Sequence, residues 1–473
     1  MVFSSILFIL FFLPAFVSTY YFAPKKLKNI VILLFSIVFY SWGAPRFIFV
    51  ILGTTFLDFH LVRWMSQSKR ENQRRLLLAL SVSINLGLLV YFKYSNFFVE
   101  NLNAVLSLLG SETHIHWTKL VLPIGISFYT FESITYVVDV YRRVHKPLSD
   151  FWNYQLYIIF FPKLIAGPIV RYHDLADQIE DRSANETVDN ILTGFYRFAI
   201  GMAKKVLIAN QMGVYADSVF ALNYADVGTA TAWFGILAYT FQIYFDFAGY
   251  SDMAIGIARM VGFRFPENFN NPYVSQSITE FWRRWHMTLG AWMRDYLYIP
   301  LGGNRVSTPR LYFNLWFVFL ASGLWHGASW NFIFWGAYHG LFLVLERAFL
   351  LKVYKKIGAL PRVLITFFLV AIGWVFFRIE HFGDAIAFVK RLFAFEKGDF
   401  AMNPEFFFYL FVAVIFSFIT FFTFGKRWNE SVFFANYDNK KHITMFVVVL
   451  ILLIFSIASI SAFGFNPFIY FRF

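Results

Sequence analysis

Long apolar stretches recur from one end of this 473-residue sequence to the other. The clearest lie at residues 4–22, 76–92, 361–377, 406–424 and 443–463. Each is about as long as a helix that crosses a hydrocarbon core of roughly 30 Å. A helix satisfies its backbone hydrogen bonds internally, so apolar runs of this length cross a bilayer as helices. The sequence therefore predicts an all-α, polytopic integral membrane protein.

The composition supports this class and explains the positive charge. Hydrophobic residues make up 59% of the chain and charged residues 15%, whereas soluble globular chains are about one quarter charged. The formal charge is +13, but the basic residues cluster in short loops such as 24–29, 66–75 and 141–146. This distribution is typical of cytoplasmic loops and does not indicate a nucleic-acid partner. With those loops inside, we expect the span 76–97 to lead to an outer loop at 98–119 and the N-terminus to be extracytoplasmic.

The sequence contains no cysteine. Structural disulfides, cysteine-ligated metals and a thiol acyl-enzyme are therefore excluded. We expect no metal site, and any covalent chemistry must use other side chains.

In the middle of the chain the apolar runs become shorter and are interrupted by proline, glycine and charge. This pattern is clearest at 160–174, 244–273 and 296–305. Broken helices at membrane depth are tolerated only where protein or a water-filled cavity satisfies the freed backbone groups. We therefore expect the middle third of the chain to surround a cavity.

The sequence shows no internal repeat, low-complexity tract or soluble domain. A single membrane domain over residues 1–473 is predicted. Within it we distinguish N-terminal helices at 1–146, a core with the cavity at 147–340, and C-terminal helices at 341–473.

Charged side chains inside membrane segments cost about 2.5 to 3.5 kcal/mol each on insertion scales, so each needs a partner or a function. Asp246 and Asp252 lie in "YFDFAGYSD" and suggest a cation path, a hydrogen-bonded brace or a turn. A brace is the favoured interpretation. Lys204 and Lys205 lie in "GMAKKVLIAN", and their spacing indicates no more than a cytoplasmic helix end.

Residues 277–305, "SITEFWRRWHMTLGAWMRDYLYIPLGGNR", concentrate charge among aromatic side chains. If this segment is helical, Glu280 lies one turn from Arg283 and Arg284 and neutralises part of their charge. Two interpretations stay open. The segment is an amphipathic helix that only anchors in the membrane interface, or its unpaired arginines bind phosphate, whose geometry a guanidinium matches.

His326 lies in "ASGLWHGASW" (321–330) and has no carboxylate within eight residues on either side. Its small neighbours permit close helix approach or room for a substrate. On a continuous helix, Ser322, Ser329, Trp330 and Ile333 would share its face. A satisfied core histidine and a functional histidine are equally compatible with this local pattern.

Two longer blocks, "TEFWRRWHMTLGAWMRDYLYIPLGGNR" and "SGLWHGASWNFIFWGAYHG", place His286 and His326 40 positions apart. In this order they resemble the membrane-bound O-acyltransferase family, in the bacterial branch that includes alginate O-acetylation proteins. The resemblance extends over nearly the whole chain. It includes "FYSWGAP", "LPIGISFYTFESITYVVDVYR", "FFPKLIAGPI", "FQIYFDFAGYSDMAIGIARMVGF" and "NPFIYFRF".

The resemblance implies about 11 or more membrane segments around a tunnel, with broken or re-entrant helices. It implies that acetyl-CoA is the cytoplasmic acyl donor and that no cofactor is bound permanently. It also implies a bacterial inner-membrane location, a periplasmic SGNH-type acetyltransferase partner and a cell-surface polysaccharide such as alginate as final acceptor. His326 maps onto the catalytic histidine, and His286 maps onto the polar residue that ends the first block, which is often asparagine in eukaryotic relatives. The candidates for binding the coenzyme A phosphates are Arg283, Arg284, Arg294, Lys204 and Lys205.

Acyl transfer from a thioester to a hydroxyl requires deprotonation of the hydroxyl and stabilisation of the developing oxyanion. His326 is the expected base, and the absence of a nearby carboxylate favours its neutral form. His286 is expected to orient the thioester carbonyl or to stabilise the oxyanion. Direct transfer and an acyl-histidine intermediate both fit these residues.

Three other activities remain as alternatives. Peptidoglycan O-acetylation and D-alanyl transfer to teichoic acid use related proteins of similar architecture. A polytopic transporter is the alternative from another class, although the sequence shows no pair of related halves.

Overall fold

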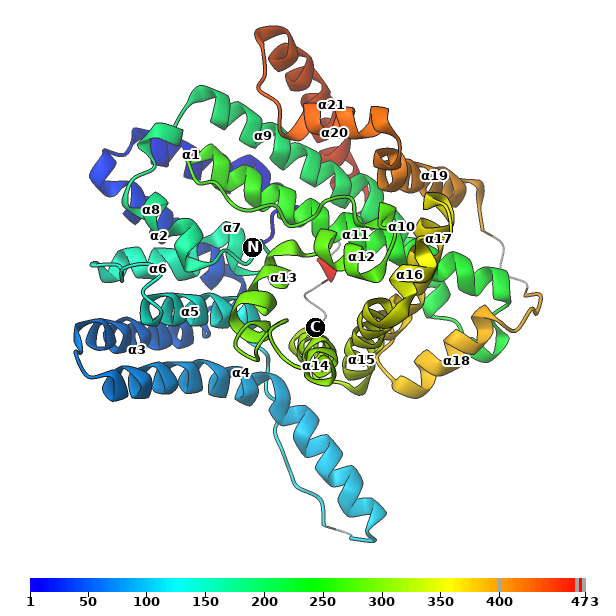
Figure 1. Ribbon diagram of the computed structural model, residues 1–473. Coiled ribbons are helices and arrows are strands. Elements are labelled where there is room, and N and C mark those ends of the chain that lie inside the picture. The colour runs from blue at the N-terminus through cyan, green and yellow to red at the C-terminus, as the bar shows by residue number, and fades with distance from the viewer. Residues whose placement is uncertain (112, 399–401, 464–467, 470–473) are drawn as a thin grey trace. The chain divides into compact units, whose positions relative to one another are not determined.

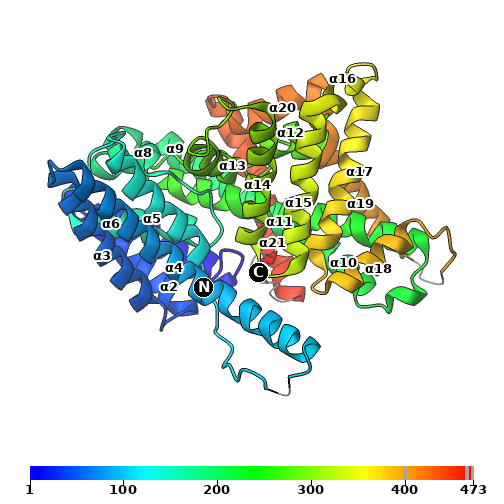
Figure 2. The same ribbon diagram turned by 60° about the horizontal axis from the view of Figure 1, so that its bottom comes forward.

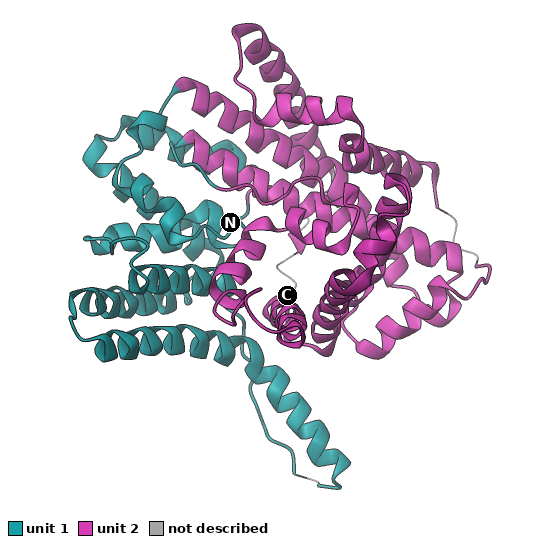
Figure 3. Ribbon diagram, viewed as in Figure 1, with its two compact units in different colours: residues 1–2, 7–187, 261–265 teal, residues 3–6, 188–260, 266–473 magenta. Residues whose placement is uncertain are grey.

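The protein is described by a computed structural model that covers residues 1–111, 113–398, 402–463 and 468–469. These residues form helices and connecting segments without a strand (Figure 1). The predicted all-α class is therefore confirmed. The chain divides into two compact units, residues 1–2, 7–187 and 261–265, and residues 3–6, 188–260 and 266–473 (Figure 3). We call them unit 1 and unit 2.

Unit 1 holds the first eight α-helices. They are α1 (Leu13–Phe22), α2 (Lys28–Gly43), α3 (Ile48–Gln67), α4 (Glu71–Leu108), α5 (Ile126–Tyr141), α6 (Phe151–Ile159), α7 (Phe161–Leu164) and α8 (Tyr172–Glu180). The expected interruption at 160–174 is present, because α6, the single-turn α7 and α8 are separated by irregular backbone.

Unit 2 holds the remaining α-helices. They are α9 (Val188–Ala203), α10 (Asn210–Phe220), α11 (Thr229–Met260), α12 (Ile278–Arg284), α13 (Met287–Met293), α14 (Thr308–His326), α15 (Trp330–Leu345), α16 (Leu351–Tyr354), α17 (Ala359–Arg378), α18 (Phe382–Leu392), α19 (Pro404–Phe418), α20 (Thr423–Phe433) and α21 (Asn439–Phe463). Among the described residues, no helix covers 299–307, which agrees with the interruption expected at 296–305.

Seven helical stretches of the described chain are long and apolar enough to cross a membrane. They are Lys25–Gly43, Ile48–Gln67, Glu71–Leu108, Trp330–Tyr354, Ala359–Arg378, Pro404–Phe421 and Asn439–Ala462, and a shorter apolar helix covers Phe8–Phe22. These helices confirm a multi-pass membrane protein. The larger number of about 11 segments stays a prediction.

In unit 1, α3, α4 and α5 lie side by side (Figures 1 and 2). α4 has 38 residues, so at 1.5 Å per residue it is about 57 Å long and exceeds a hydrocarbon core of roughly 30 Å. Residues 98–108, expected to begin a loop, extend this helix because residues 98–109 contain no glycine or proline. Gly110 adopts a φ of 76°, and Ser111 N–H donates to the carbonyl of Leu106. That left-handed glycine ends the helix.

In unit 2, α9 and α11 pack against each other at unusually short range through glycines on both helices. A Cβ added to Gly201 would lie 2.6 Å from the carbonyl oxygen of Gly249, and one added to Gly249 would lie 2.6 Å from that of Gly201. Further along α11, a Cβ added to Gly256 would lie 2.5 Å from the carbonyl oxygen of Gly194 on α9. Only glycine fits these positions without moving the backbone.

The interruption expected at 244–273 begins only after Met260, and the same contact explains why α11 does not break before that residue. It continues through Asp246, Gly249 and Asp252 as one 32-residue helix and ends at Met260. Gly249 therefore permits close helix packing and does not interrupt the helix.

Replacement of Gly249 by alanine is expected to lower the free energy of unfolding by about 1 to 3 kcal/mol, the usual cost of forcing an extra methyl into a packed interior. The neighbouring atom is a backbone oxygen, which cannot move aside as a side-chain end would. Thermal unfolding of the protein in lipid nanodiscs measures the effect. Gly53→Ala on α3 is the matched control, because a Cβ there meets no atom within 4 Å. Equal melting temperatures for the two variants would contradict the packing argument.

Candidate active site

His326 is the last residue of α14, where this helix turns back into α15. The two helices pack closely, because a Cβ on Gly323 would lie 2.2 Å from the carbonyl oxygen of Phe332. A Cβ on Gly327 would lie 2.1 Å from the Phe332 ring. The glycines on either side of the histidine thus permit the tight hairpin that holds it.

Aromatic rings surround the His326 imidazole, which is only 5% exposed. The ring centroids of Trp325, Trp335 and Phe377 lie 5.0, 5.1 and 5.2 Å from its own. The helical face expected to join His326 to Ser329 is interrupted, because α14 ends at His326 and α15 begins at Trp330. The ring contacts of the histidine therefore come from three helices, α14, α15 and α17, and not from one continuous helix.

His286 lies between α12 and α13 and is 1% exposed. Its backbone has a φ of 44°, in the left-handed region that non-glycine residues rarely adopt. Strained backbone of this kind concentrates at functional sites. Burial lowers the pKa of the imidazole to about 3, so the ring is neutral at physiological pH.

The structure brings the two predicted histidines into one neighbourhood of unit 2. The Trp325 ring centroid lies 5.0 Å from that of His326 and 6.2 Å from that of His286. Phe247 of α11 packs edge-on against His286 with a centroid distance of 4.7 Å. One indole therefore contacts both imidazoles.

Asn268 binds His286 and did not emerge from the sequence. Its Oδ1 lies 3.0 Å from His286 Nδ1 and also accepts a hydrogen bond of 2.9 Å from the Thr288 hydroxyl. Its Nδ2 donates to the Ser251 hydroxyl at 2.9 Å. Asn268 is one of several asparagines in "ENFNNPY", and nothing in the sequence distinguishes the one that lies beside a histidine 18 positions away.

Charged side chains of α9, and of the π-helix Lys204–Ala209 that continues it, pair with those of α11. Asp252 binds Arg197 at 2.8 Å and Lys204 at 2.6 Å. Lys205 binds Asp246 at 2.6 Å, and both side chains are almost fully buried. The two aspartates are therefore braces, as favoured from the sequence. Each also compensates a lysine that was a candidate for coenzyme A phosphate.

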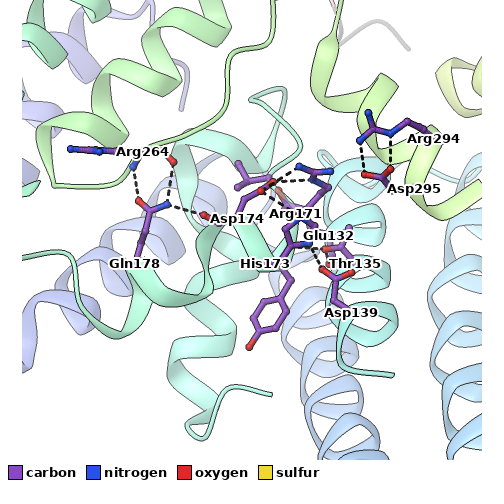
Figure 4. A network of polar contacts seen from close by, with 12 residues as sticks. Glu132, Thr135, Asp139, Arg171, His173, Asp174, Gln178, Arg264, Arg294 and Asp295 are labelled. Carbon is purple, nitrogen blue, oxygen red and sulfur yellow. Dashed lines mark hydrogen bonds and ion pairs between the residues drawn. The ribbon is translucent and has the colours of Figure 1, made fainter. Parts of the chain in front are cut away.

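The candidate arginines differ in their surroundings. Arg284 binds Glu280 at 2.8 Å, one helical turn away as predicted, and Arg294 binds the adjacent Asp295 at 2.7 Å (Figure 4). Arg283 is exposed and forms no ion pair within the described part of the chain. Among the five predicted phosphate-binding cations, its charge is therefore the least compensated.

A pocket with a cavity volume of about 150 Å³ opens beside the α9–α11 ion pairs. Two cations and two carboxylates line it, so their formal charges balance. The charged residues are Arg197, Lys204, Asp252 and Glu267, and the amide of Asn268 and the ring of Phe433 are among the other lining groups. The pocket therefore reaches the asparagine that binds His286, and its charge balance gives no net attraction for an anion.

Unit 1 contains a buried ion pair that the sequence analysis missed. Glu132 of α5 binds Lys163 of α7, and both side chains are fully buried. The Lys163 ammonium also lies 4.6 Å from the centroid of the Tyr157 ring. Each residue lies in a motif that carried the family resemblance, and their charge inside apolar sequence was the available indication.

A second polar network joins α5 to α8 in unit 1 (Figure 4). His173 Nδ1 lies 2.7 Å from Asp139 Oδ2, and Arg171 binds Asp174 at 2.9 Å. The Asp139 carboxylate raises the pKa of His173 above its usual value. No cluster of three or more potential metal ligands occurs within the described residues.

The membrane spans place this helical protein in the class of integral membrane proteins, and two of its buried histidines lie against a shared indole. The comparison with known families is more specific. Residues 3–379 match the model of the membrane-bound O-acyltransferase family. The chain belongs to this family and is an O-acyltransferase.

Three relatives show where in the family it lies. It is 46% identical to a probable alginate O-acetylase, AlgI, of Pseudomonas aeruginosa over 84% of this chain and 75% of the relative. It is 36% identical to a peptidoglycan O-acetyltransferase of Helicobacter pylori over 83% and 80% of the two chains. It is 30% identical to a teichoic acid D-alanyltransferase of Bacillus subtilis over 56% and 70%.

Removal of one partner of the Glu132–Lys163 pair is expected to lower the free energy of unfolding by about 3 to 5 kcal/mol, because the other charge is left buried and uncompensated. Glu132→Gln and Lys163→Met should each lower the thermal unfolding temperature in nanodiscs. The double variant should lose less than the sum, because no lone charge remains.

The matched control is Lys25→Met, which breaks the exposed Lys25–Asp181 pair. It should cost no more than about 1 kcal/mol. Additive losses in the Glu132→Gln/Lys163→Met double variant would show that the buried charges do not depend on each other.

Proposed function

We propose that the protein transfers acetyl from cytoplasmic acetyl-CoA, through a tunnel in the membrane, toward O-acetylation of an alginate-like cell-surface polysaccharide. The observation that carries this proposal is the position of His326. In a member of an O-acyltransferase family, the predicted catalytic histidine is buried among aromatic rings and shares Trp325 with a second buried histidine. Such surroundings exclude water, which would otherwise hydrolyse the thioester.

The identity values favour an alginate-type acceptor over the alternatives. The relative named for alginate O-acetylation is 46% identical, the one named for peptidoglycan 36% and the one named for teichoic acid 30%. The last of these also matches a smaller share of this chain, 56% against 84%. Peptidoglycan acetylation is the second candidate and D-alanyl transfer the third.

The reaction needs one base in the position of His326. The acceptor oxygen attacks the thioester carbonyl carbon while its proton passes to an imidazole nitrogen of His326. The C–S bond then breaks, and the coenzyme A sulfur leaves and takes this proton. The imidazole is thereby regenerated, so one histidine serves as base and then as acid.

The same proposal sets the orientation of the protein. We place it in a bacterial inner membrane with its basic loops in the cytoplasm and its N-terminus outside. Acetyl-CoA then enters from the cytoplasm, and the acetyl group leaves on the periplasmic side. A periplasmic SGNH-type acetyltransferase is the proposed partner that carries acetyl to the polymer.

Arg283 is the side chain we propose for the coenzyme A phosphates. A phosphate that bound Lys204, Lys205, Arg284 or Arg294 would compete with the carboxylate already paired to each. Arg283 is exposed and would gain a partner without losing one. The other four cations are weaker candidates.

Replacement of His326 by alanine is expected to lower kcat for acetyl transfer at least about 100-fold, the lower range for loss of a positioned general base. The assay follows release of coenzyme A by purified protein in nanodiscs, with and without a candidate periplasmic partner. Tyr312→Phe, at the partly exposed start of α14, is the control variant, and it should fold and turn over like wild type. Wild-type-like turnover by His326→Ala would refute the assignment.

Labelled acetyl-CoA without an acceptor separates the two chemical routes. Acetyl retained covalently on wild-type protein but absent from His326→Ala would establish an acyl-histidine intermediate. Full turnover with acceptor and no retained label would establish direct transfer.

Arg283→Gln is expected to raise KM for acetyl-CoA several-fold, roughly 1 kcal/mol for a charge-assisted contact, with little change in kcat. Acetyl-3′-dephospho-CoA tests the contact directly. If Arg283 binds the ribose phosphate, removal of that phosphate should raise KM for wild type but not for the variant. Arg284→Gln is the control, because its charge is already paired with Glu280. An unchanged KM in Arg283→Gln would remove Arg283 from the binding site.

A further inference from the structure

His286 has a hydrogen-bond partner on one ring nitrogen only. Nδ1 lies 3.0 Å from Asn268 Oδ1. Nε2 is buried and has no hydrogen-bond partner within the described part of the chain. A buried polar atom without a partner typically costs about 1 to 3 kcal/mol, and in native proteins it calls for a functional explanation.

The orientation of the Asn268 amide follows from its other contacts. The backbone N–H of Thr288 can only donate, and it points at the same amide atom as His286 Nδ1, at 3.4 Å. An amide NH2 in that position would face another N–H, so this atom is the oxygen. The amide nitrogen then faces the Ser251 hydroxyl, which can accept its hydrogen bond.

The amide orientation determines the tautomer of His286. Because Oδ1 of Asn268 is an acceptor, Nδ1 of the neutral imidazole must carry the proton. Nε2 therefore presents a lone pair and not an N–H. A lone pair repels an oxyanion, so the neutral ring cannot stabilise the negative charge that develops on the thioester oxygen.

We propose that Asn268 is a positioning residue that holds His286 in the Nδ1–H tautomer, so that Nε2 accepts a hydrogen bond from the donor or acceptor substrate. This inference rests on the proposed acetyl transfer for its substrate. The groups able to donate to Nε2 are an acceptor hydroxyl and an amide N–H of the pantetheine arm. Its role thus differs from both roles expected from the sequence.

The backbone around the pair supports this assignment. His286 adopts its left-handed conformation where α12 ends, and Met287 N–H donates to the Asn268 carbonyl at 2.9 Å. The segment at 268 and the turn at 286–288 are therefore joined through both main chain and side chain. That double attachment fixes the imidazole plane as well as its tautomer.

Four charged groups line the pocket that Asn268 reaches. They are Asp252 and Glu267 with Arg197 and Lys204, and they pair with one another. Within the described residues, His286 takes part in none of these ion pairs. Its state therefore depends on the neutral amide, and a carboxylate in the place of that amide should change it.

The first experiment reads the tautomer without any activity. Full-length protein in nanodiscs is labelled with 15N at the histidine ring nitrogens, and His286→Gln identifies the signals of His286. We expect a protonated Nδ1 and an unprotonated Nε2, distinguished by their couplings to the ring C–H protons. In Asn268→Leu the two forms should mix, whereas Ser251→Ala, which removes the bond on the other side of the amide, should leave the tautomer unchanged. A protonated Nε2 in wild type would overturn the proposal.

The second experiment tests the consequence for catalysis. Asn268→Leu should lower kcat about 10- to 100-fold, the range seen when an orienting partner is removed, with a smaller change in KM. Asn268→Asp keeps an acceptor, but its carboxylate favours the doubly protonated ring. Its activity should therefore recover only at higher pH than that of wild type. A uniform loss at all pH values in Asn268→Asp, with the wild-type tautomer retained, would overturn the proposal.

The positioning by Asn268 and the proposed function can be refuted independently of each other. If wild-type protein shows the Nδ1–H tautomer but transfers no acetyl, the proposed function is wrong and the positioning by Asn268 stands. If acetyl transfer is observed while His286 carries its proton on Nε2, the function stands and the positioning is wrong.

Discussion

The short contact between α9 and α11 is the constraint on which unit 2 depends. At Gly201 and Gly249 no side chain separates the two backbones, so the charged groups on either side meet across the helix pair. Lys205 reaches Asp246, and Asp252 receives both Arg197 and Lys204. Without these partners each buried charge would carry a desolvation cost of several kcal/mol. The packing of small residues and the pairing of charges are therefore one arrangement.

The same arrangement positions the histidine pair. Ser251 precedes Asp252 on α11 and accepts the hydrogen bond of the Asn268 amide, whose oxygen faces His286. Phe247, one turn earlier on α11, packs against the His286 ring. A single helix, held by glycine contacts and ion pairs, thus supports both the amide and one face of the imidazole. A substitution that shifts α11 would therefore displace Asn268 and the His286 ring, even if the substituted residue lies outside the candidate site.

The sequence predicted what depends on composition and on local pattern. Apolar length predicted the membrane helices. The two histidine blocks indicated His286 and His326 as site candidates, and both rings lie against Trp325, while their catalytic roles stay predictions. Contacts between distant segments were not predictable. The partner of His286 lies 18 residues away, and the glycine in "FAGYSD" was taken for a helix interruption although it is a packing contact. In both cases the sequence shows the residue type, but the role of the residue depends on a contact with a segment elsewhere in the chain.

The two histidines lie in environments that suit different chemical roles. His326 sits at a helix end among three aromatic rings, which exclude water from the imidazole. His286 is attached to an amide that holds one proton on Nδ1 and leaves a lone pair on Nε2. A ring fixed in this way is suited to orient a substrate and poorly suited to stabilise an oxyanion. In the proposed reaction the donors to the oxyanion then come from other groups, and buried indoles meet the chemical requirement because an indole N–H can only donate. Trp282 and Trp335 pack against each other at 5.3 Å, and Trp335 also contacts His326. Their Nε1 atoms are buried and have no acceptor within the described residues, so they can donate hydrogen bonds that neither imidazole supplies.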